Sequence, residues 1–373
     1  MKVQEKLKII DLFSGVGGLS YGFAHDNNFK IVAANEILPQ MAKSYGYNHK
    51  DVRVYCRDIK HFSFTDLQND LGIKDGEIDI VVGGPPCQAY STVGKRLIDD
   101  PRGVLFQEYF RILQEVKPRF FLFENVKGLL SMSNGELLPT IIELFSSLGY
   151  DVQYQVLNAA DYGTPQVRER VIITGSMLSE RYEYPIKTHY NPLDHSQQWD
   201  SKLIPYLTLS DALSDLPLMA DRKLKVKYES DPQNHYQRKM RAGATDKIEE
   251  HLIPNNSDHL IKLMELLPEG GTPKDLPLEF RPESGFGNSY SRLWWDRPST
   301  TITRNLGTPS SARCIHPLAP RPLTTREGAR LQGFPDSYKF FGSRSEKNLQ
   351  IGNAVPTILS EALVKSIKKH FHI

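Results

Sequence analysis

The chain has 373 residues, 39% of them hydrophobic, with 46 basic and 44 acidic side chains and a formal net charge of +2. This length disfavours a single ordinary core and fits one large domain with a smaller one. No apolar run is long enough to span a bilayer and no secretory signal is visible, so we expect a cytoplasmic protein without a membrane partner. Three cysteines without metal-ligand spacing, Cys56, Cys87 and Cys314, argue against a disulfide framework and against a zinc site.

The charges are unevenly distributed along the chain. Residues 1–150 carry 17 basic and 18 acidic side chains, a net charge of −1. Residues 281–330 carry eight arginines, no lysine and three acids, and residues 222–241 carry seven bases and two acids, so each stretch has a net charge of +5. Such clusters are usually solvated surface, but two of them in one half of the chain favour a nucleic-acid partner.

Short apolar runs in the first half predict strands, and most of these runs are continuous rather than alternating, as in a parallel sheet covered on both faces. Helical spacing of apolar residues over 105–116 and 137–148 separates them. The alternation predicts a doubly wound α/β fold that binds its ligands at the carboxyl ends of the strands. The predicted strands are 7–12, 30–35, 78–82, 119–123, 152–157 and 170–174.

The second half has a different texture. Residues 185–320 are rich in Pro, Gly, Asn, His and Arg and lack strong periodicity, which predicts a smaller inserted domain of irregular, β-rich structure. Helical spacing returns over 357–370 and predicts a helix that packs on the sheet. We therefore expect a catalytic domain over 1–184, completed by 346–373, and a second domain with a hinge over 185–345.

The first predicted strand runs into a glycine-rich turn that opens a helix. A dinucleotide fingerprint needs glycine at positions 15, 17 and 20, and position 20 is Ser20, which weakens the alternative of a nicotinamide-dependent oxidoreductase. Glu36 follows Gly18 by 18 residues and ends the second strand, where a carboxylate can accept hydrogen bonds from both ribose hydroxyls. The pattern favours a nucleoside ligand without phosphates, although a plain strand-to-helix turn would also contain these glycines.

Two further strand ends carry groups that suit covalent catalysis. The strand before Gly83-Gly84-Pro85-Pro86 leads into Cys87, a thiol on a stiffened backbone, and a rigidly placed thiolate is a nucleophile. Glu124 ends the next strand. It is either a surface turn residue or, in a cleft with Cys87, a general acid with a raised pKa.

Eight segments, in order along almost the whole chain, resemble the signatures of (cytosine-5) DNA methyltransferases of the bacterial restriction–modification type. They are the turn at 11–19, Glu36, Asp58-Ile59, the Pro-Pro-Cys-Gln at 85–88, Glu124-Asn125-Val126, Gln166 to Arg170, Arg321 to Pro335 and Gln350 to Pro356. The resemblance implies a class I S-adenosylmethionine-dependent methyltransferase fold, with 185–345 as the target-recognition domain. It also implies S-adenosyl-L-methionine as cofactor, bound by Phe13, Gly15, Gly17, Gly18, Leu19, Glu36, Ile37, Asp58, Ile59, Pro86, Leu105, Asn353, Ala354 and Val355.

The resemblance implies a covalent route, because carbon 5 of cytosine is not nucleophilic enough to take a methyl group unaided. Cys87 would add to carbon 6, and Glu124 would protonate or hydrogen-bond ring nitrogen 3. Arg170, supported by Arg168, would bind the cytosine carbonyl oxygen. A structural ion pair with Glu169 or another acid is the alternative role for the two arginines.

The implied partner is double-stranded DNA, from which the cytosine must be flipped. The resemblance implies that Gln88, Ser91, Lys95 and Arg102 belong to a mobile loop that closes over DNA. Major-groove contacts are expected from the second domain, at Arg292, Arg297, Arg304 and Arg313. We expect a monomer of bacterial or phage origin that protects DNA from a cognate restriction endonuclease.

Two other functions fit the same motifs. A tRNA cytosine-5 methyltransferase of this kind carries a Cys-Phe-Thr triplet in the second domain, whereas Cys314 here is followed by Ile-His. A catalytically silent DNA-binding regulator loses the nucleophile or the glycine turn, and this chain retains both.

Overall fold

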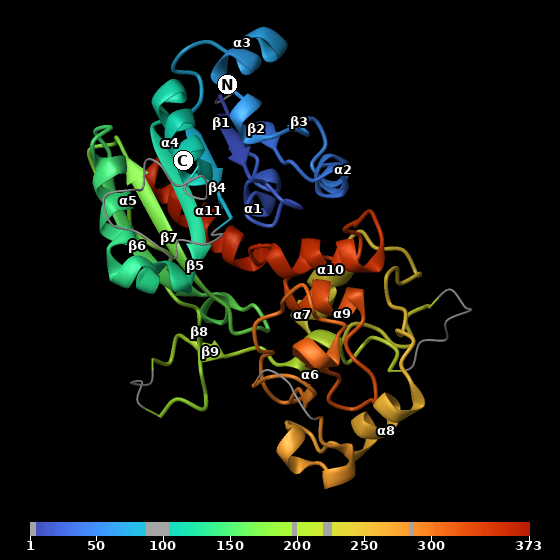
Figure 1. Cartoon of the computed structure of the whole chain (residues 1–373). Helices are drawn as coiled ribbons and strands as arrows, with labels where there is room; N and C mark the ends of the chain where they lie inside the picture. The colour runs from blue at the N-terminus through green and yellow to red at the C-terminus, as the bar shows by residue number, and fades with distance from the viewer. Residues whose placement is uncertain (1–4, 87–103, 196–199, 219–225, 283–286) are drawn as a thin grey trace. The chain divides into compact units, whose positions relative to one another are not determined.

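The computed structural model describes residues 5–86, 104–195, 200–218, 226–282 and 287–373 (Figure 1). Cys87, Gln88, Ser91, Lys95 and Arg102 therefore lie outside the described residues. The chain divides into two compact units. Unit 1 comprises Met1–Asn158, Glu169–Ile186 and Leu359–Ile373, and unit 2 comprises Ala159–Arg168 and Lys187–Ile358. No helix among the described residues is long and apolar enough to cross a membrane.

Unit 1 is built on one seven-stranded sheet, in the order β3-β2-β1-β4-β5-β7-β6. Neighbours from β3 to β5 are parallel, and β7 runs antiparallel between β5 and β6. This confirms the predicted, mostly parallel sheet. The strands are β1 (Leu7–Leu12), β2 (Phe29–Asn35), β3 (Arg53–Tyr55), β4 (Ile80–Gly83), β5 (Phe120–Val126), β6 (Asp151–Asn158) and β7 (Glu169–Ser176).

Helices cover both faces of this sheet. Phe121 of β5 belongs to the core shared with α3, α4 and α5, whereas Phe120, on the opposite face, contacts the rings of His370 and Phe371 at the end of the chain. The predicted helices over 105–116, 137–148 and 357–370 correspond to α4, α5 and α11. The helices of unit 1 are α1 (Tyr21–Ala24), α2 (Pro39–Asn48), α3 (Phe64–Leu71), α4 (Val104–Val116) and α5 (Leu137–Ser146), with α11 (Thr357–His370) contributing from Leu359 onward.

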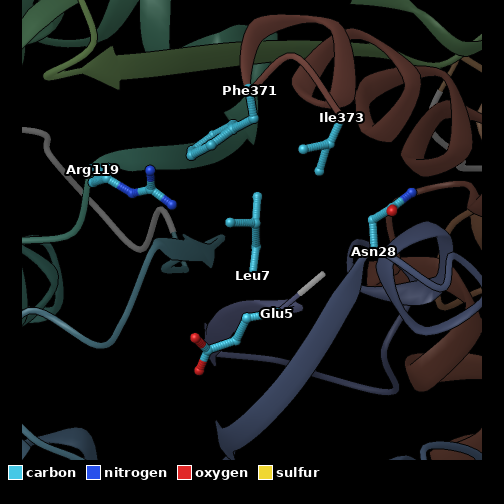
Figure 2. Close-up of a pocket in the computed structure, with 6 residues that line it drawn as sticks. All are labelled: Glu5, Leu7, Asn28, Arg119, Phe371 and Ile373. Atoms are coloured by element: carbon cyan, nitrogen blue, oxygen red, sulfur yellow. The ribbon is translucent and has the colours of Figure 1, made fainter. Parts of the chain in front are cut away.

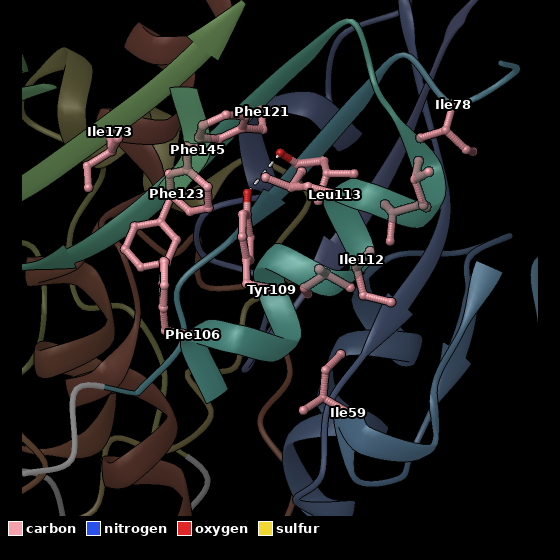
Figure 3. Packing of buried hydrophobic residues seen from close by; sticks show 14 of the residues in the cluster. Ile59, Ile78, Phe106, Tyr109, Ile112, Leu113, Phe121, Phe123, Phe145 and Ile173 are labelled. Atoms are coloured by element: carbon pink, nitrogen blue, oxygen red, sulfur yellow. Dashed lines mark hydrogen bonds between the residues drawn. The ribbon is translucent and has the colours of Figure 1, made fainter. Parts of the chain in front are cut away.

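Aromatic packing of α4 fixes the centre of the sheet. Figure 3 shows Tyr109 among Phe121, Phe123 and Phe145, with edge contacts at ring-centroid distances of 6.3, 5.1 and 5.9 Å. The Tyr109 hydroxyl is buried and donates to the main-chain oxygen of Leu122 at 3.1 Å. This packing holds β4 and β5, the strands that lead to Cys87 and Glu124.

Unit 2 differs from the prediction of a β-rich domain. Its described strands are two short pairs, β8 (His189–Tyr190) with β9 (Ile204–Pro205), and β10 (Ser291–Arg292) with β11 (Arg313–Ile315). The prediction was wrong because aperiodic, proline-rich sequence was interpreted as irregular strands. The described helices are α6 (Leu209–Leu213), α7 (His235–Arg241), α8 (Asp258–Leu266), α9 (Thr325–Leu331) and α10 (Arg344–Asn353).

Buried arginines hold unit 2 together. Arg321 forms two hydrogen bonds with Glu327, at 2.8 and 2.7 Å, and Arg330 forms two with Asp336, at 2.9 and 2.6 Å. Arg326 donates to three main-chain oxygens. All three guanidinium groups are buried. Much of the positive charge of 281–330 is therefore internal rather than solvated surface charge.

Candidate active site

The carboxyl ends of four adjacent strands form the candidate site in unit 1. Leu12 at the end of β1 pairs with Asn35 of β2 and with Gly83 of β4, and Gly83 pairs with Phe123 of β5. The next residues along each strand therefore lie at one edge of the sheet: Phe13, Glu36, Gly84 and Glu124. From β1, the sheet extends through β2 and β3 to one side and through β4 and β5 to the other, so β1 and β4 flank a topological switch point. Open α/β sheets bind their ligands at such a point.

Glu36 ties the glycine turn to the start of α2. Its Oε2 accepts the Gly15 N–H at 2.8 Å, and its Oε1 accepts the Leu38 N–H at 2.8 Å. Burial raises the pKa of this carboxyl, and the backbone N–H donors oppose the rise. A carboxylate oxygen accepts more than one hydrogen bond, so both oxygens can also accept from a ligand hydroxyl.

Gly17 allows the turn to approach a buried histidine. It has φ +92°, and a Cβ there would lie 2.1 Å from Nε2 of His49. His49 stacks on Tyr45 at 4.2 Å, and burial lowers its pKa to about 3, so the imidazole is neutral. The turn thus rests on an uncharged, packed ring.

Replacing Gly17 by Ala is expected to destabilise unit 1 by more than backbone strain alone. Gly149 has the same φ, +92°, but open space at its Cβ position, so Gly149→Ala is a matched control. We expect a loss of about 1–2 kcal/mol for the control and a further loss of about 1–3 kcal/mol for Gly17→Ala from overpacking. Denaturant unfolding measures both, and equal losses would contradict this account of the turn.

The other predicted cofactor residues have varied environments. Ile37 is 57% exposed, an unusual position for a large apolar side chain, and follows Glu36 directly. Asp58 is half-buried and accepts the Lys60 N–H at 3.0 Å. The side chain of Ile59 is buried in the core, so only its main chain remains for a ligand.

The remaining cofactor candidates divide between the two units. Gly18 and Leu19 are buried in the turn, Phe13 and Leu105 are partly buried against the core, and Pro86 is exposed. Asn353, Ala354 and Val355 belong to unit 2, where Asn353 ends α10.

Glu124 and Arg170 form an ion pair next to the end of β4. Nε of Arg170 lies 2.6 Å from Oε1 of Glu124, and the two side chains are only 10% and 12% exposed. In the antiparallel register of β5 and β7, Arg170 pairs with Val126, so it lies diagonally across from Glu124 on the same face. A Cβ on Gly84 would lie 2.6 Å from Oε2 of Glu124, so the glycine makes room for the carboxyl group.

Asn125 anchors the stretch that leads to Cys87. Its Nδ2 donates to the main-chain oxygen of Pro85 at 3.3 Å, and its Oδ1 accepts the Val126 N–H at 2.9 Å. In the sequence, Asn125 belongs to the Glu124-Asn125-Val126 motif and has no predicted role. The structure shows that it joins the end of β5 to the segment after β4, which fixes the approach to the candidate nucleophile.

Arg168 does not occupy the position expected for a catalytic group. It belongs to unit 2, is 1% exposed, and donates to the main-chain oxygens of Ile302 and Gly352, each at 2.7 Å. These main-chain contacts favour a structural role for Arg168, and its predicted support of Arg170 in catalysis stays a prediction. Arg170, two residues later, contacts Glu124.

The four arginines predicted to contact DNA are not equally available. Arg292 is 5% exposed and donates to the main-chain oxygens of His316, Pro317, Ala319 and Met264, so the predicted base contact is corrected. The Arg313 guanidinium lies 4.4 Å from the ring centre of Trp294 and also donates to main-chain oxygens.

Arg297 and Arg304 are the two of these four arginines that remain open to solvent. Arg297 lies 5.1 Å from the ring centre of Trp294, and its side chain is 43% exposed. Arg304 is exposed and makes no side-chain hydrogen bond or ion pair with the described part of the chain.

A cavity of about 220 Å³ lies near the amino ends of the strands, whereas the candidate site lies at their carboxyl ends. Figure 2 shows its lining, which includes Leu7 at the start of β1, Asn28 just before β2 and Arg119 just before β5. These residues mark the amino ends of the strands, so the cavity is separate from the predicted site.

The comparisons with known proteins agree with this architecture. A family model described as C-5 cytosine-specific DNA methylase matches residues 7–369. The chain is 35% identical to the Type II methyltransferase M.AgeI of Thalassovita gelatinovora, over 97% of this chain and 99% of that protein. It is 33% identical to M1.HphI of Haemophilus parahaemolyticus, over 97% of this chain and 87% of that protein.

Solved structures share the fold. A candidate DNA modification methyltransferase encoded within an E. coli prophage matches with a TM-score of 0.78 and 26% identity, over 99% of this chain and 100% of that chain. The Dnmt2 methyltransferase of S. pombe matches with a TM-score of 0.63 and 18% identity, over 99% of this chain and 100% of that chain, a likeness of fold alone.

The sheet order and the groups at its carboxyl edge define a class I methyltransferase fold. The chain belongs to the C-5 cytosine-specific DNA methylase family and is a DNA (cytosine-5) methyltransferase of the restriction–modification type. The family and the fold imply S-adenosylmethionine as the methyl donor.

Proposed function

We propose that the protein methylates carbon 5 of a flipped cytosine in a specific duplex DNA sequence through a covalent bond to Cys87. The observation that carries the proposal is the buried Glu124–Arg170 ion pair, at the end of the strand beside the one that leads to Cys87. Such a pair places a carboxyl group, which can carry a proton, beside a cation, the two groups needed at ring nitrogen 3 and the adjacent carbonyl oxygen of cytosine.

The glycine turn and its neighbours fit S-adenosylmethionine. Glu36 would accept hydrogen bonds from the ribose hydroxyls, and the exposed side chain of Ile37 would lie against the adenine. Asp58 would accept from the adenine amino group. When bound, the cofactor supplies an electrophilic methyl group.

The chain's own residues would activate the cytosine. The Cys87 thiolate forms a bond to carbon 6 while Glu124 donates a proton to nitrogen 3, which makes carbon 5 nucleophilic. After carbon 5 has taken the methyl group, it loses its proton to water, Cys87 leaves as the thiolate, the double bond between carbons 5 and 6 is restored, and nitrogen 3 returns its proton to the Glu124 carboxylate. Arg170 stabilises the negative charge that develops on the carbonyl oxygen and holds the Glu124 carboxyl in place.

The exposure of side chains to solvent indicates which residues of the described chain could contact DNA. Of the four arginines predicted to contact DNA, Arg297 and Arg304 would do so, together with Gln88, Ser91, Lys95 and Arg102 outside the described residues. The protein would act as a monomer on double-stranded DNA and protect it from a partner restriction endonuclease.

Cys87→Ser tests the covalent step. The variant is expected to bind S-adenosylmethionine with unchanged affinity in calorimetry and to transfer no labelled methyl group to unmethylated genomic DNA. Cys56→Ser, at a cysteine that the structure shows to be exposed, is the matched control and should remain active. Full activity of Cys87→Ser would exclude the mechanism.

The same labelled-methyl assay tests the substrate. Methylation of duplex DNA is expected, and bisulfite sequencing of the product gives the target site. Methylation of tRNA without duplex DNA would establish the tRNA enzyme instead. DNA binding without any transfer would establish a silent regulator.

A further inference from the structure

Residues 299–304 of unit 2 run beside residues 165–167, close before the strand that carries Arg170. The Ser299 N–H donates to the main-chain oxygen of Pro165 at 3.0 Å, and the Val167 N–H donates to that of Ser299 at 2.8 Å. A bridge pairs Gln166 with Ser299 in parallel. The two stretches are therefore joined along their main chains.

The side chains of Gln166 and Arg168 hold the same segment at Ile302. Oε1 of Gln166 accepts the Ile302 N–H at 2.8 Å, and Nη1 of Arg168 donates to the Ile302 main-chain oxygen at 2.7 Å. Both side chains are fully buried. The peptide groups on either side of Ile302 are thus fixed by two buried side chains from one short stretch.

The same two side chains also bind the region around α9 and α10. Nε2 of Gln166 donates to the Leu331 main-chain oxygen at 2.9 Å, and Nη2 of Arg168 donates to that of Gly352 at 2.7 Å. A Cβ on Gly352 would lie only 2.2 Å from the main-chain nitrogen of Arg304. Residues 299–304 therefore have little freedom to shift.

This fixed segment presents polar side chains to solvent. Ile302 is 3% exposed, whereas Thr301, Thr303 and Arg304 are exposed. The Arg304 guanidinium makes no side-chain contact of its own within the described residues. A cation on a rigid segment, without an internal partner, suits an anionic partner such as a phosphate group.

We propose that Gln166 and Arg168 form a clamp that fixes residues 299–304 and so holds Arg304 in position to contact a phosphate of the DNA backbone. Phosphate contacts set the register of a protein on a duplex. Because Arg168 precedes Arg170 by two residues, one short stretch would link the register of the DNA to the catalytic strand. Arg168 is then a positioning residue. This inference rests on the proposed function. It assigns Arg304 as a residue that contacts a DNA phosphate and thereby sets the register of the protein on the duplex.

The test compares Arg168→Met, Arg168→Lys and Arg304→Gln on a duplex that carries the site methylated by the wild-type protein. Arg304→Gln should raise the KM for DNA and leave kcat unchanged. The slope of the logarithm of DNA affinity against the logarithm of salt concentration should decrease by the equivalent of about one phosphate contact. Arg168→Met should raise the same KM by about 10- to 100-fold, and Arg168→Lys, which retains a donor, should recover part of it. The affinity for S-adenosylmethionine should not change in either Arg168 variant.

The double variant Arg168→Met/Arg304→Gln gives the decisive comparison. If the clamp acts through Arg304, the loss from Arg168→Met is much smaller once Arg304 is absent. The proposal would be overturned if the fold-losses of the two single variants multiplied in the double variant. It would also be overturned if Arg168→Met lowered kcat without raising the KM for DNA. If that variant does not fold, Arg168→Lys replaces it in the same comparison. A wild-type protein that methylates no DNA would refute the proposed function, whereas an active wild type with independent losses refutes only the clamp.

Discussion

Glu124→Gln is expected to lower kcat for methyl transfer about 10²- to 10⁴-fold, the usual contribution of a general acid. Gln has nearly the shape of Glu, so it should fit beside Gly84, but its amide cannot transfer a proton to and from ring nitrogen 3, and it removes the carboxylate that lies 2.6 Å from Arg170. Single-turnover transfer of a labelled methyl group measures the effect. The affinity for S-adenosylmethionine should change little.

Glu108→Gln is the matched control. It removes a carboxylate that lies 2.7 Å from Nε of Arg111, a comparable ion pair on α4 away from the strand ends. A partly exposed pair of this kind is worth about 0–1 kcal/mol, and the methylation rate should not change. If Glu124→Gln retained the wild-type kcat, Glu124 would not be the residue that transfers the proton to ring nitrogen 3.

Arg330→Met is expected to destabilise unit 2 by about 3–5 kcal/mol, because it leaves buried carboxylates without their cation. Arg330 bonds to Asp336 at 2.6 and 2.9 Å and to Asp215 at 3.1 Å, and all three side chains are essentially inaccessible to solvent. The charge of Arg330 holds the pKa of Asp336 below its usual range. All three tryptophans lie in unit 2, so denaturant unfolding followed by tryptophan fluorescence reports on the affected unit.

Arg281→Met is the control for this prediction. Arg281 donates to the main-chain oxygens of Leu276 and Lys274 near the surface and, within the part of the chain that the structure describes, pairs with no buried acid. We expect a loss of at most about 1 kcal/mol there. Adding Asp215→Asn and Asp336→Asn to Arg330→Met should recover part of the lost stability. An unchanged unfolding midpoint in Arg330→Met would contradict the account of the buried arginines.

The sheet was predictable because its central strands are continuous apolar runs. The runs at 7–12, 30–35 and 78–82 correspond to β1, β2 and β4, with boundaries shifted by at most a few residues. β3 was missed because Arg53–Tyr55 is three residues long and carries no apolar run. Unit 2 was not predictable in this way, because buried arginines contribute to its interior and some of their partners are distant in the sequence, such as Asp215 for Arg330.

The candidate site was predictable in part for a related reason. Motif residues at the ends of parallel strands, such as Glu36 and Glu124, meet at one edge once the strand order is right. Arg168 and Arg170 have the same side chain two residues apart, and nothing in their local sequence distinguishes them. The partners that do so, Ile302 and Gly352, lie more than a hundred residues away.

The most direct test of the proposed mechanism uses a duplex with 5-fluorocytosine at the target position. Fluorine at carbon 5 cannot leave as a proton, so the bond between carbon 6 and Cys87 should persist after methyl transfer. We predict a stable protein–DNA adduct that forms only with S-adenosylmethionine present, and peptide mass spectrometry should place it on Cys87. Methylation of ordinary duplex DNA with no adduct on the fluorinated duplex, or an adduct at Cys56 or Cys314, would contradict the mechanism.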